Sequence, residues 1–524
     1  MPNLSRRDVL KLASATAGAA VVPATLAAEP PARTQAPVPL WDCFELSLDG
    51  PQDGNPFVDV ELSATFTLQH RNVHVSGFYD GSGKYKIRFM PDVQGHWSYI
   101  TASNRPALNN QSGSFEAIAA LKNSHGPVGV QNTFHFAHAD GTPFFPFGTT
   151  CYAWIHQSES LQQQTLATLK SAPFNKLRMC VFPKSYEYNH NEPELYPFER
   201  DAAGHNDFTR FNPAFFAHVE RRIADLRALG IEADLILFHP YDRWGYSSMP
   251  PEADDRYLRY ILARLSAYPN IWWSLANEYD LMKSKTVQDF DRFFRIVEQH
   301  DPYRHLRSVH YSHTMYDYSR PWVTHASIQT YDFAAAPTYR ASWNKPVCYD
   351  EVQYEGNLNS RWGNLSGDEM ARRFWLGVIN GCYVTHGETY LEGNSFNENE
   401  TPTIWWSHGG QLHGSSPKQI AFLRKLVEET ASSTSKPGLA PQQNPYYLNA
   451  SAINPTTRKT EAILYYFDYH QPVWYEFPLP EGTFIAEQID PQEATLTKVE
   501  GHWSGKAKIR LPAKPYQALR FTRV

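Results

Sequence analysis

The fold is decided by short apolar runs that end abruptly in a polar residue, and the clearest of them is Ile271-Trp-Trp-Ser-Leu-Ala-Asn-Glu278. A second run, Val347-Cys-Tyr-Asp-Glu351, ends in the same way. Continuous runs of this kind are typical of strands that are buried on both faces of a parallel sheet. Because enzymes with parallel barrels do chemistry at the C-terminal ends of strands, the two terminal carboxylates are the first candidates for catalysis.

Strand-like runs alternate with amphipathic helices from about residue 125 to residue 435. This alternation is the signature of repeated βα units, and eight of them predict one (β/α)8 TIM barrel. One helix is expected to begin at Asn212-Pro213 and close at Gly230, and another to begin at a capping box made by Ser366 and Glu369. The expected strands are residues 144–149, 176–182, 232–238, 271–275, 306–310, 326–330, 347–350 and 383–386.

The segments on either side of this span, residues 36–120 and 440–524, alternate apolar and polar residues between turns. Such alternation predicts an N-terminal and a C-terminal β-sandwich, so the whole chain is expected to be an α/β protein with a barrel between two sandwiches. Two long connections, residues 183–211 and 389–416, follow the second and eighth strands. Their positions predict that they wall a cleft.

Composition narrows the classes of partner. The 524 residues carry a net charge of −6, which argues against binding nucleic acid. After the N-terminal region no run approaches the ~18 apolar residues that a membrane span needs. The five cysteines form no Cys-x-x-Cys pair and no evident disulfide framework. A disulfide bridge between Cys151 and Cys382 is one possibility, because the two residues are expected on neighbouring strands.

The N-terminus carries Arg6-Arg7 ahead of a weakly apolar stretch that ends in small residues at Ala27 and Ala28. A twin arginine before such a stretch is typical of a Tat export signal, so residues 1–28 are predicted to be removed. The mature protein would then be periplasmic or secreted by a bacterium. The alternative is a cytosolic N-terminus that happens to contain two arginines.

Strands four and seven of an eight-stranded barrel face each other across its mouth, so Glu278 and Glu351 are expected to converge. Retaining cleavage of a glycosidic bond uses two carboxyl groups about 5–5.5 Å apart. One acts as nucleophile, and the other as acid and then base. The alternative is that both carboxylates only form salt bridges or cap helices.

The segment that ends in Asn277-Glu278 resembles the acid/base motif of the clan A glycoside hydrolases, and Lys345-Pro to Glu351 resembles their nucleophile strand. The resemblance implies that Glu278 is the acid/base, Glu351 the nucleophile and Asn277 a donor to a sugar hydroxyl. It further implies that Arg178 steadies the nucleophile and that Tyr331 donates a hydrogen bond to it.

The order of the modules resembles a branch of glycoside hydrolases related to the apiosidase-like barrels. The N-terminal segments Phe78-Tyr-Asp-Gly81 and Gly95-His-Trp97 are similar to its leading module. The chain departs from the clan where Tyr279 and Val352 follow the two glutamates. Asp350 and Glu355 are therefore rival nucleophiles.

Other polar and aromatic residues are expected near strand ends. Candidates for binding sugar hydroxyls are His239, His310, His386 and Glu355, and candidates for stacking on sugar rings include Trp154, Trp244, Trp362, Trp405 and Trp406. Each could instead be structural. His239 and His386 have acidic neighbours and could mimic metal ligands, but no His-x-His motif supports this, so no metal and no cofactor are predicted.

Together these features predict an exported retaining glycoside hydrolase that acts on oligosaccharides or polysaccharides. The inserted loops favour exo-action. Neither the sugar nor the oligomeric state can be read from one sequence. The alternatives are a non-catalytic carbohydrate-binding protein on a barrel scaffold and a metal-dependent barrel hydrolase.

Overall fold

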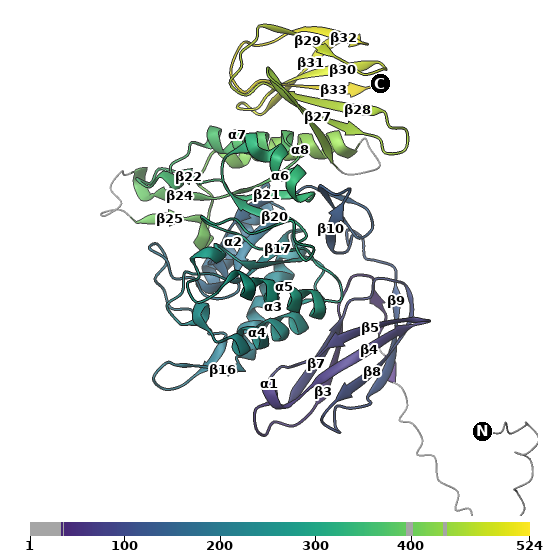
Figure 1. Ribbon diagram of the computed structural model, residues 1–524, viewed down its shortest axis with the longest axis vertical. Coiled ribbons are helices and arrows are strands. Elements are labelled where there is room, and N and C mark those ends of the chain that lie inside the picture. The colour runs from purple at the N-terminus through teal and green to yellow at the C-terminus, as the bar shows by residue number, and fades with distance from the viewer. Residues whose placement is uncertain (1–32, 35, 395–401, 433–437) are drawn as a thin grey trace, which may run out of the picture.

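The computed structural model describes residues 33–34, 36–394, 402–432 and 438–524, so the predicted signal segment lies outside the described residues. Figure 1 shows an N-terminal β-body, a central α/β-body and a C-terminal β-body arranged along the long axis of the molecule. Among the described residues no helix is long and apolar enough to cross a membrane.

The central body is the predicted barrel, in which all neighbouring strands pair in parallel. The strand order is β19-β18-β17-β14-β13-β23-β21-β20, and a parallel bridge between His310 and Ser327 joins the two ends of this order. The strands are β13 (Phe147–Thr150), β14 (Lys176–Cys180), β17 (Glu232–Phe238), β18 (Ile271–Ala276), β19 (Arg307–Ser308), β20 (Ala326–Gln329), β21 (Val347–Glu351) and β23 (Tyr383–His386).

The first strand begins later than predicted. Pro143–Phe144 form β12, which belongs to a small antiparallel sheet with β10 (Val128–Gln131) and β11 (His135–His138). Pro146, which has no N–H group to donate, separates β12 from the barrel strand. Phe136 of the small sheet packs against Trp272 and Tyr383, near the N-terminal ends of their strands, with ring centroids 5.0 and 5.1 Å apart. The small sheet therefore covers the N-terminal end of the barrel.

The helices that cover the barrel begin largely where their sequence signals predict. The Asn212 side chain accepts a hydrogen bond from Ala214 N, and Gly230 follows the helix at φ +71°. The capping box predicted at Ser366 is only half formed, because the Glu369 carboxylate pairs with Arg372 and Arg373 instead. These helices are α2 (Glu159–Ser171), α3 (Pro213–Ala228), α4 (Pro251–Leu265), α5 (Val287–His300), α6 (Ala336–Trp343), α7 (Gly367–Ile379) and α8 (Ser416–Ser432).

The N-terminal body is a β-sandwich. Its core includes Phe66 and Phe89, whose rings stack 4.2 Å apart between two sheets. Arg88 crosses to the barrel and donates to Glu220 on α3. One sheet holds β1 (Arg33–Thr34), β2 (Val38–Pro39), β4 (Leu62–Leu68), β5 (Arg71–Ser76), β8 (Gly95–Ser103) and β9 (Ser112–Ile118); the other holds β3 (Phe44–Asp49), β6 (Phe78–Tyr79) and β7 (Lys84–Phe89), and the short helix α1 is Pro56–Asp59.

The C-terminal body packs a two-stranded ribbon over a six-stranded sheet around an aromatic core. It rests on α7, where Trp375 stacks on Tyr466 with ring centroids 5.3 Å apart. The sheet contains β26 (Leu439–Asn444), β27 (Tyr447–Ile453), β28 (Thr460–Tyr466), β30 (Phe484–Asp490), β31 (Thr495–Trp503) and β33 (Ala518–Arg523), and the ribbon is β29 (Trp474–Pro478) with β32 (Lys506–Arg510).

The cysteines are unpaired. All five lie among the described residues and are free, so the possible bridge between Cys151 and Cys382 is not formed. The Cys151 thiol instead donates to the Trp406 carbonyl at 3.1 Å.

Four buried charged side chains meet inside the barrel. Lys176 Nζ lies 2.7 Å from Asp350 and 2.9 Å from Asp234, and Arg178 bonds the same two carboxylates. Burial would raise the pKa of Asp350, but the charges of Lys176 and Arg178 outweigh burial and hold this pKa well below its usual range. Asp350 therefore points into the barrel and does not line the cavity described below, so the suggestion that it is a rival nucleophile is wrong.

Replacing Asp350 with Asn should lower the melting temperature strongly, because Lys176 and Arg178 would remain buried with one carboxylate partner fewer. Breaking a buried ion pair costs about 3–5 kcal/mol. Asp49→Asn is the matched control, since Asp49 pairs with Lys84 on the surface and such pairs contribute about 0–1 kcal/mol. Thermal unfolding followed by circular dichroism compares the two variants. Equal melting temperatures would contradict a stabilising role for the interior charges.

Candidate active site

A cavity of about 490 Å³ opens at the C-terminal ends of the barrel strands. Glu278, just after β18, and Glu351, at the end of β21, both line it. The long connections after the second and eighth strands contribute Lys184, Tyr186 and Trp405, which is consistent with the predicted walls. The remaining lining residues are Tyr241, Leu281, Ser312, Gln329, Thr330, Tyr331, Gln353, Tyr354, Trp362.

Glu278 is held in a strained backbone conformation at the end of its strand. Its φ and ψ are +48° and +54°, a left-handed region that a residue with a Cβ enters at a cost. Its N–H donates to His310 Nδ1 at 3.3 Å, and its carboxylate accepts hydrogen bonds from Tyr241 and Asn277. When the Gln329 amide is oriented to satisfy its neighbours, its nitrogen also donates to Glu278 at 3.2 Å. Several groups thus fix the direction of this carboxylate.

Glu351 receives its hydrogen bond from a tyrosine that the sequence interpretation missed. The hydroxyl of Tyr152, three residues beyond the predicted first strand, donates to Glu351 Oε1. Tyr331, to which the resemblance gives this role, lies at the rim with 48% of its surface exposed, and its hydroxyl accepts from Arg361 at 2.6 Å. Tyr241, which donates to Glu278, also lies three residues after a predicted strand. Tyrosines just past strand ends were therefore the sequence signal that could have identified the partners of both glutamates.

Arg178 lies beneath the two glutamates and contacts neither carboxylate directly. Its guanidinium binds Asp234 and Asp350, and it donates to Asn277 Oδ1 at 3.2 Å. Its charge acts on Glu351 from a distance. The resemblance implies that Arg178 contacts the nucleophile directly, but here Arg178 orients Asn277 instead.

Lys184 places a positive charge beside the two glutamates. It is almost fully buried, and Nζ lies 4.1 Å from the ring centroid of Tyr241 and 4.3 Å from that of Tyr152. Trp405 and Tyr186 lie farther from it, at 5.4 and 5.5 Å. Burial lowers the pKa of this lysine, while the nearby acidic groups oppose the shift. Lys184 therefore offsets part of the negative charge in the cavity.

The two carboxyl groups influence each other. Burial, and next the charge of Glu278, raise the pKa of Glu351 to about 7, against the opposing effects of the Tyr152 hydrogen bond, Lys184 and Arg178. The charge of Glu278 therefore acts on the Glu351 carboxyl group, which takes up a proton more readily than a free glutamate does. Two carboxyl groups in different environments can divide the roles of acid and nucleophile.

The histidines and Glu355 lie behind the cavity rather than on its surface. His239 Nε2 donates to the Phe182 carbonyl at 3.1 Å, and His386 Nδ1 lies 3.0 Å from Thr149 Oγ1. Glu355 is buried and accepts from Ser415 N at 2.7 Å. Of the four residues predicted to bind sugar hydroxyls, His310 is the one with a hydrogen bond to a cavity residue in the described part of the chain, and this bond is to the backbone of Glu278.

The tryptophans divide into packing and cavity residues. Trp154 and Trp406 are buried in the barrel core, so their predicted exposure to sugar rings is wrong. Trp244 lies outside the cavity and donates to Glu192 at 2.8 Å. Trp362 and Trp405 do line the cavity and can offer ring faces to a sugar.

Comparison with known proteins agrees with this geometry. A family model described as "Apiosidase-like, catalytic domain" matches residues 130–433, which is more than half of the chain. The chain belongs to the apiosidase-like family. Domains of unknown function match on either side, DUF5060 over residues 37–104 and DUF5605 over residues 452–522. A comparison with curated proteins gave no match.

Solved structures extend the likeness to nearly the whole chain. A candidate glycoside hydrolase from Bacteroides vulgatus is 41% identical, with 94% of this chain and 100% of that chain covered and a TM-score of 0.85. A family 5 glycoside hydrolase from the same organism shares only the fold, at 15% identity, a TM-score of 0.56, and coverage of 76% of this chain and 94% of that one. This apiosidase-like chain is a glycoside hydrolase with the clan A barrel fold.

Replacing Tyr152 with Phe should lower kcat/KM about 10- to 100-fold, because a hydrogen bond to a charged group contributes about 1.5–3 kcal/mol. The Tyr152 hydroxyl lowers the pKa of Glu351, so its loss raises that pKa and moves the acidic limb of the pH profile to higher pH. Tyr331→Phe is the control and should leave this limb in place. A limb that moves with Tyr331→Phe and not with Tyr152→Phe would return the role to Tyr331.

Proposed function

We propose that this apiosidase-like protein is a retaining glycoside hydrolase that works by double displacement. The observation that carries the proposal is that Glu278 and Glu351, from facing strands, line one cavity, where the charge of Glu278 acts on Glu351. Retention needs a nucleophile and a proton donor on opposite sides of the glycosidic bond. Two carboxyl groups that line the same cavity can supply both.

The surroundings of the two glutamates support distinct roles. Glu278 is the acid/base: Tyr241 and Asn277 hold its carboxylate, and Asn277 itself is held by Arg178. Glu351 is the nucleophile: burial and the charge of Glu278 raise its pKa, while the Tyr152 hydroxyl and the positive charges of Lys184 and Arg178 oppose that rise and favour the ionised form that attacks. In the first step Glu351 attacks the anomeric carbon while Glu278 protonates the leaving oxygen. In the second step Glu278 takes a proton from the water that releases the sugar.

The walls of the cavity support exo-action on an oligosaccharide or a polysaccharide chain end. Tyr186 and Trp405 come from different long connections, and their rings lie 5.2 Å apart. Trp362 approaches Tyr186 from a third segment, with ring centroids 6.5 Å apart. Aromatic rings gathered from three segments form a pocket suited to a terminal sugar ring rather than an open groove.

Aryl glycosides and plant or bacterial polysaccharides provide the panel on which to test these roles. Glu351→Ala and Glu278→Ala should each lower kcat by about 10³-fold or more on the responsive substrate. Azide should rescue both variants with opposite stereochemistry, giving a glycosyl azide of retained configuration with Glu278→Ala and of inverted configuration with Glu351→Ala. Glu199→Gln, on the exposed part of β15 (Phe198–Arg200), is the control.

Proton NMR of the first product released by the wild type tests the stereochemistry directly. Retention of the anomeric configuration is expected, and inversion would overturn the double-displacement mechanism. Full activity in Glu351→Ala together with loss of activity in Glu355→Gln would transfer the nucleophile role to Glu355.

We also propose that the protein is exported through the Tat pathway to the periplasm or the medium, on the basis of Arg6-Arg7 and the stretch that follows. Replacing both arginines with lysine should retain the precursor in the cytoplasm of a bacterial host that has Tat machinery. Cell fractionation and the mass of the mature N-terminus measure the outcome. Export of the double variant at the wild-type level would refute the proposal.

A further inference from the structure

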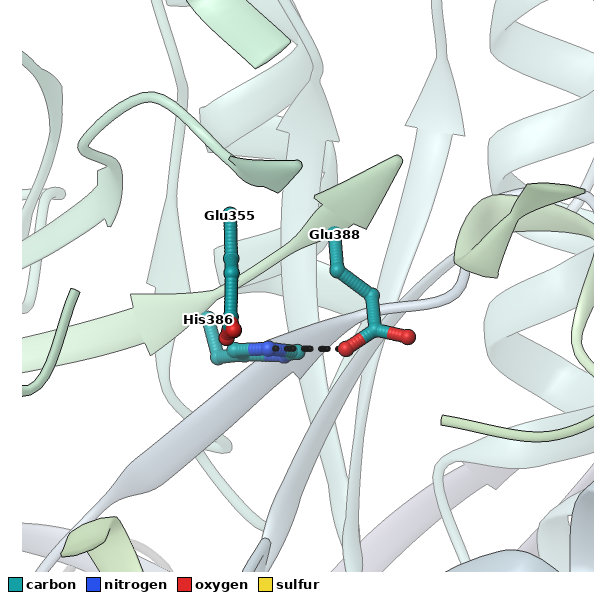
Figure 2. Close-up of side chains that lie close together, drawn as sticks. All are labelled: Glu355, His386 and Glu388. Carbon is teal, nitrogen blue, oxygen red and sulfur yellow. Dashed lines mark ion pairs between the residues drawn. The ribbon is translucent and has the colours of Figure 1, made fainter. Parts of the chain in front are cut away.

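Two buried glutamates and one buried histidine converge behind the wall of the active-site cavity. Glu355 lies on β22 (Glu355–Gly356), His386 ends β23, and Glu388 begins β24 (Glu388–Leu391). One ligand atom from each lies within 4.8 Å of the others. Figure 2 shows both carboxylates directed toward the imidazole ring. None of the three lines the cavity, so the catalytic steps leave them unused.

The imidazole of His386 presents an unused nitrogen to this cluster. The ring stacks on Phe174, with centroids 4.8 Å apart, and Nδ1 lies 3.0 Å from Thr149 Oγ1. Nε2 has no access to solvent and no hydrogen-bond partner. When Nδ1–H donates to Thr149, the lone pair of Nε2 points at Glu388. A hydrogen bond from the second ring nitrogen is the usual way in which a metal-binding histidine is oriented.

The spacing suits two ligands of one ion better than a hydrogen bond. His386 Nε2 and Glu388 Oε2 lie 3.6 Å apart (Figure 2). Metal–ligand bonds of about 2.0–2.1 Å in a tetrahedral arrangement separate the ligand atoms by about 3.3–3.4 Å. A small inward movement of the carboxylate therefore creates a binding geometry.

The two carboxylates are held in place by the turn that leads into α8. Glu388 accepts from His413 N at 2.6 Å and from Gly414 N at 3.0 Å. Glu355 accepts from Ser415 N at 2.7 Å and from the Ser416 hydroxyl at 2.5 Å. A Cβ added at Gly414 would collide with Oε2 of both glutamates, so these two oxygens approach the same point above the glycine. The donors fix the carboxylates and leave lone pairs of Glu388 available.

The cluster lacks a positive charge of its own. Among the described residues no lysine or arginine forms an ion pair with Glu355 or Glu388, whereas the interior carboxylates Asp234 and Asp350 each have two such partners. Two buried carboxylates without a cation carry a large desolvation cost. The N-terminus of α8 supplies only partial compensation, because a helix end is equivalent to about half a charge.

We propose that Glu355, His386 and Glu388 bind one divalent first-row transition metal ion as a structural site. An imidazole ligand beside two carboxylates favours Zn²⁺ or Mn²⁺ over Mg²⁺ and Ca²⁺, which prefer oxygen ligands. The ion joins the end of β23 to the segments that follow β21 and β23, which the turn before α8 also holds through hydrogen bonds. It also fixes the segment of Tyr354, the cavity residue next to Glu355.

The test uses the full mature chain purified without a histidine tag, stripped with a chelator and dialysed. Zn²⁺ alone, and Mn²⁺ alone in a parallel sample, are then added, excess metal is removed, and bound metal is counted by mass spectrometry. Thermal unfolding is measured with and without each metal. His386→Ala and Glu388→Gln remove ligands, and Glu388→Gln keeps the side-chain shape. Glu232→Gln is the matched control, since Glu232 is a buried carboxyl that accepts from Trp272 and does not belong to the cluster.

The wild type and Glu232→Gln should retain about one equivalent of metal per chain and melt several degrees higher with the metal than without it. His386→Ala and Glu388→Gln should lose both the bound equivalent and the rise in melting temperature. No retained metal in the wild type, or one equivalent retained by a folded Glu388→Gln variant, would overturn the proposal. Because neither readout involves a glycoside, this result is independent of the proposed double-displacement mechanism.

Discussion

The buried contacts of Lys176 and Arg178 with Asp234 and Asp350 are the constraint on which the rest of the barrel depends. They connect β14, β17 and β21 through the interior, where a mismatched charge has no water to stabilise it. Ser327 and Thr385 add hydrogen bonds to Asp350 from β20 and β23. Five of the eight strands are thereby held in register by one set of polar contacts.

The same contacts reach the active site through a single side chain. Arg178 donates to Asn277, which donates to Glu278, so the direction of the proposed acid/base depends on charges below the cavity floor. At this position Glu278 has a left-handed backbone conformation, which is strained for a residue with a Cβ. Strain of this kind persists only where the surroundings over-determine the conformation, and here Tyr241 and His310 contribute as well.

The sequence was sufficient to predict the barrel and to place the two glutamates at the C-terminal ends of its strands. Apolar runs that end in carboxylates indicate buried parallel strands directly. It could not separate Asp350 from Glu351, since neighbouring residues face opposite sides of a strand and both sides of this strand are buried. Tyrosines just past strand ends were a usable signal, but the pattern could not tell whether Tyr152 or Tyr331 reaches Glu351, because that depends on the length and direction of each loop. The same limit applies to Trp154. The sequence does not distinguish an aromatic residue that packs into the core after a strand end from one that faces a ligand.

The small sheet of β10, β11 and β12 closes the N-terminal end of the barrel. Phe136 seals the barrel floor against Trp272 and Tyr383, and β12 leads directly into β13. A chain shortened to start at the first barrel strand would expose these rings to water. The exposed apolar surface would promote aggregation. The barrel therefore needs the small sheet, which begins at Val128, to cover its N-terminal end.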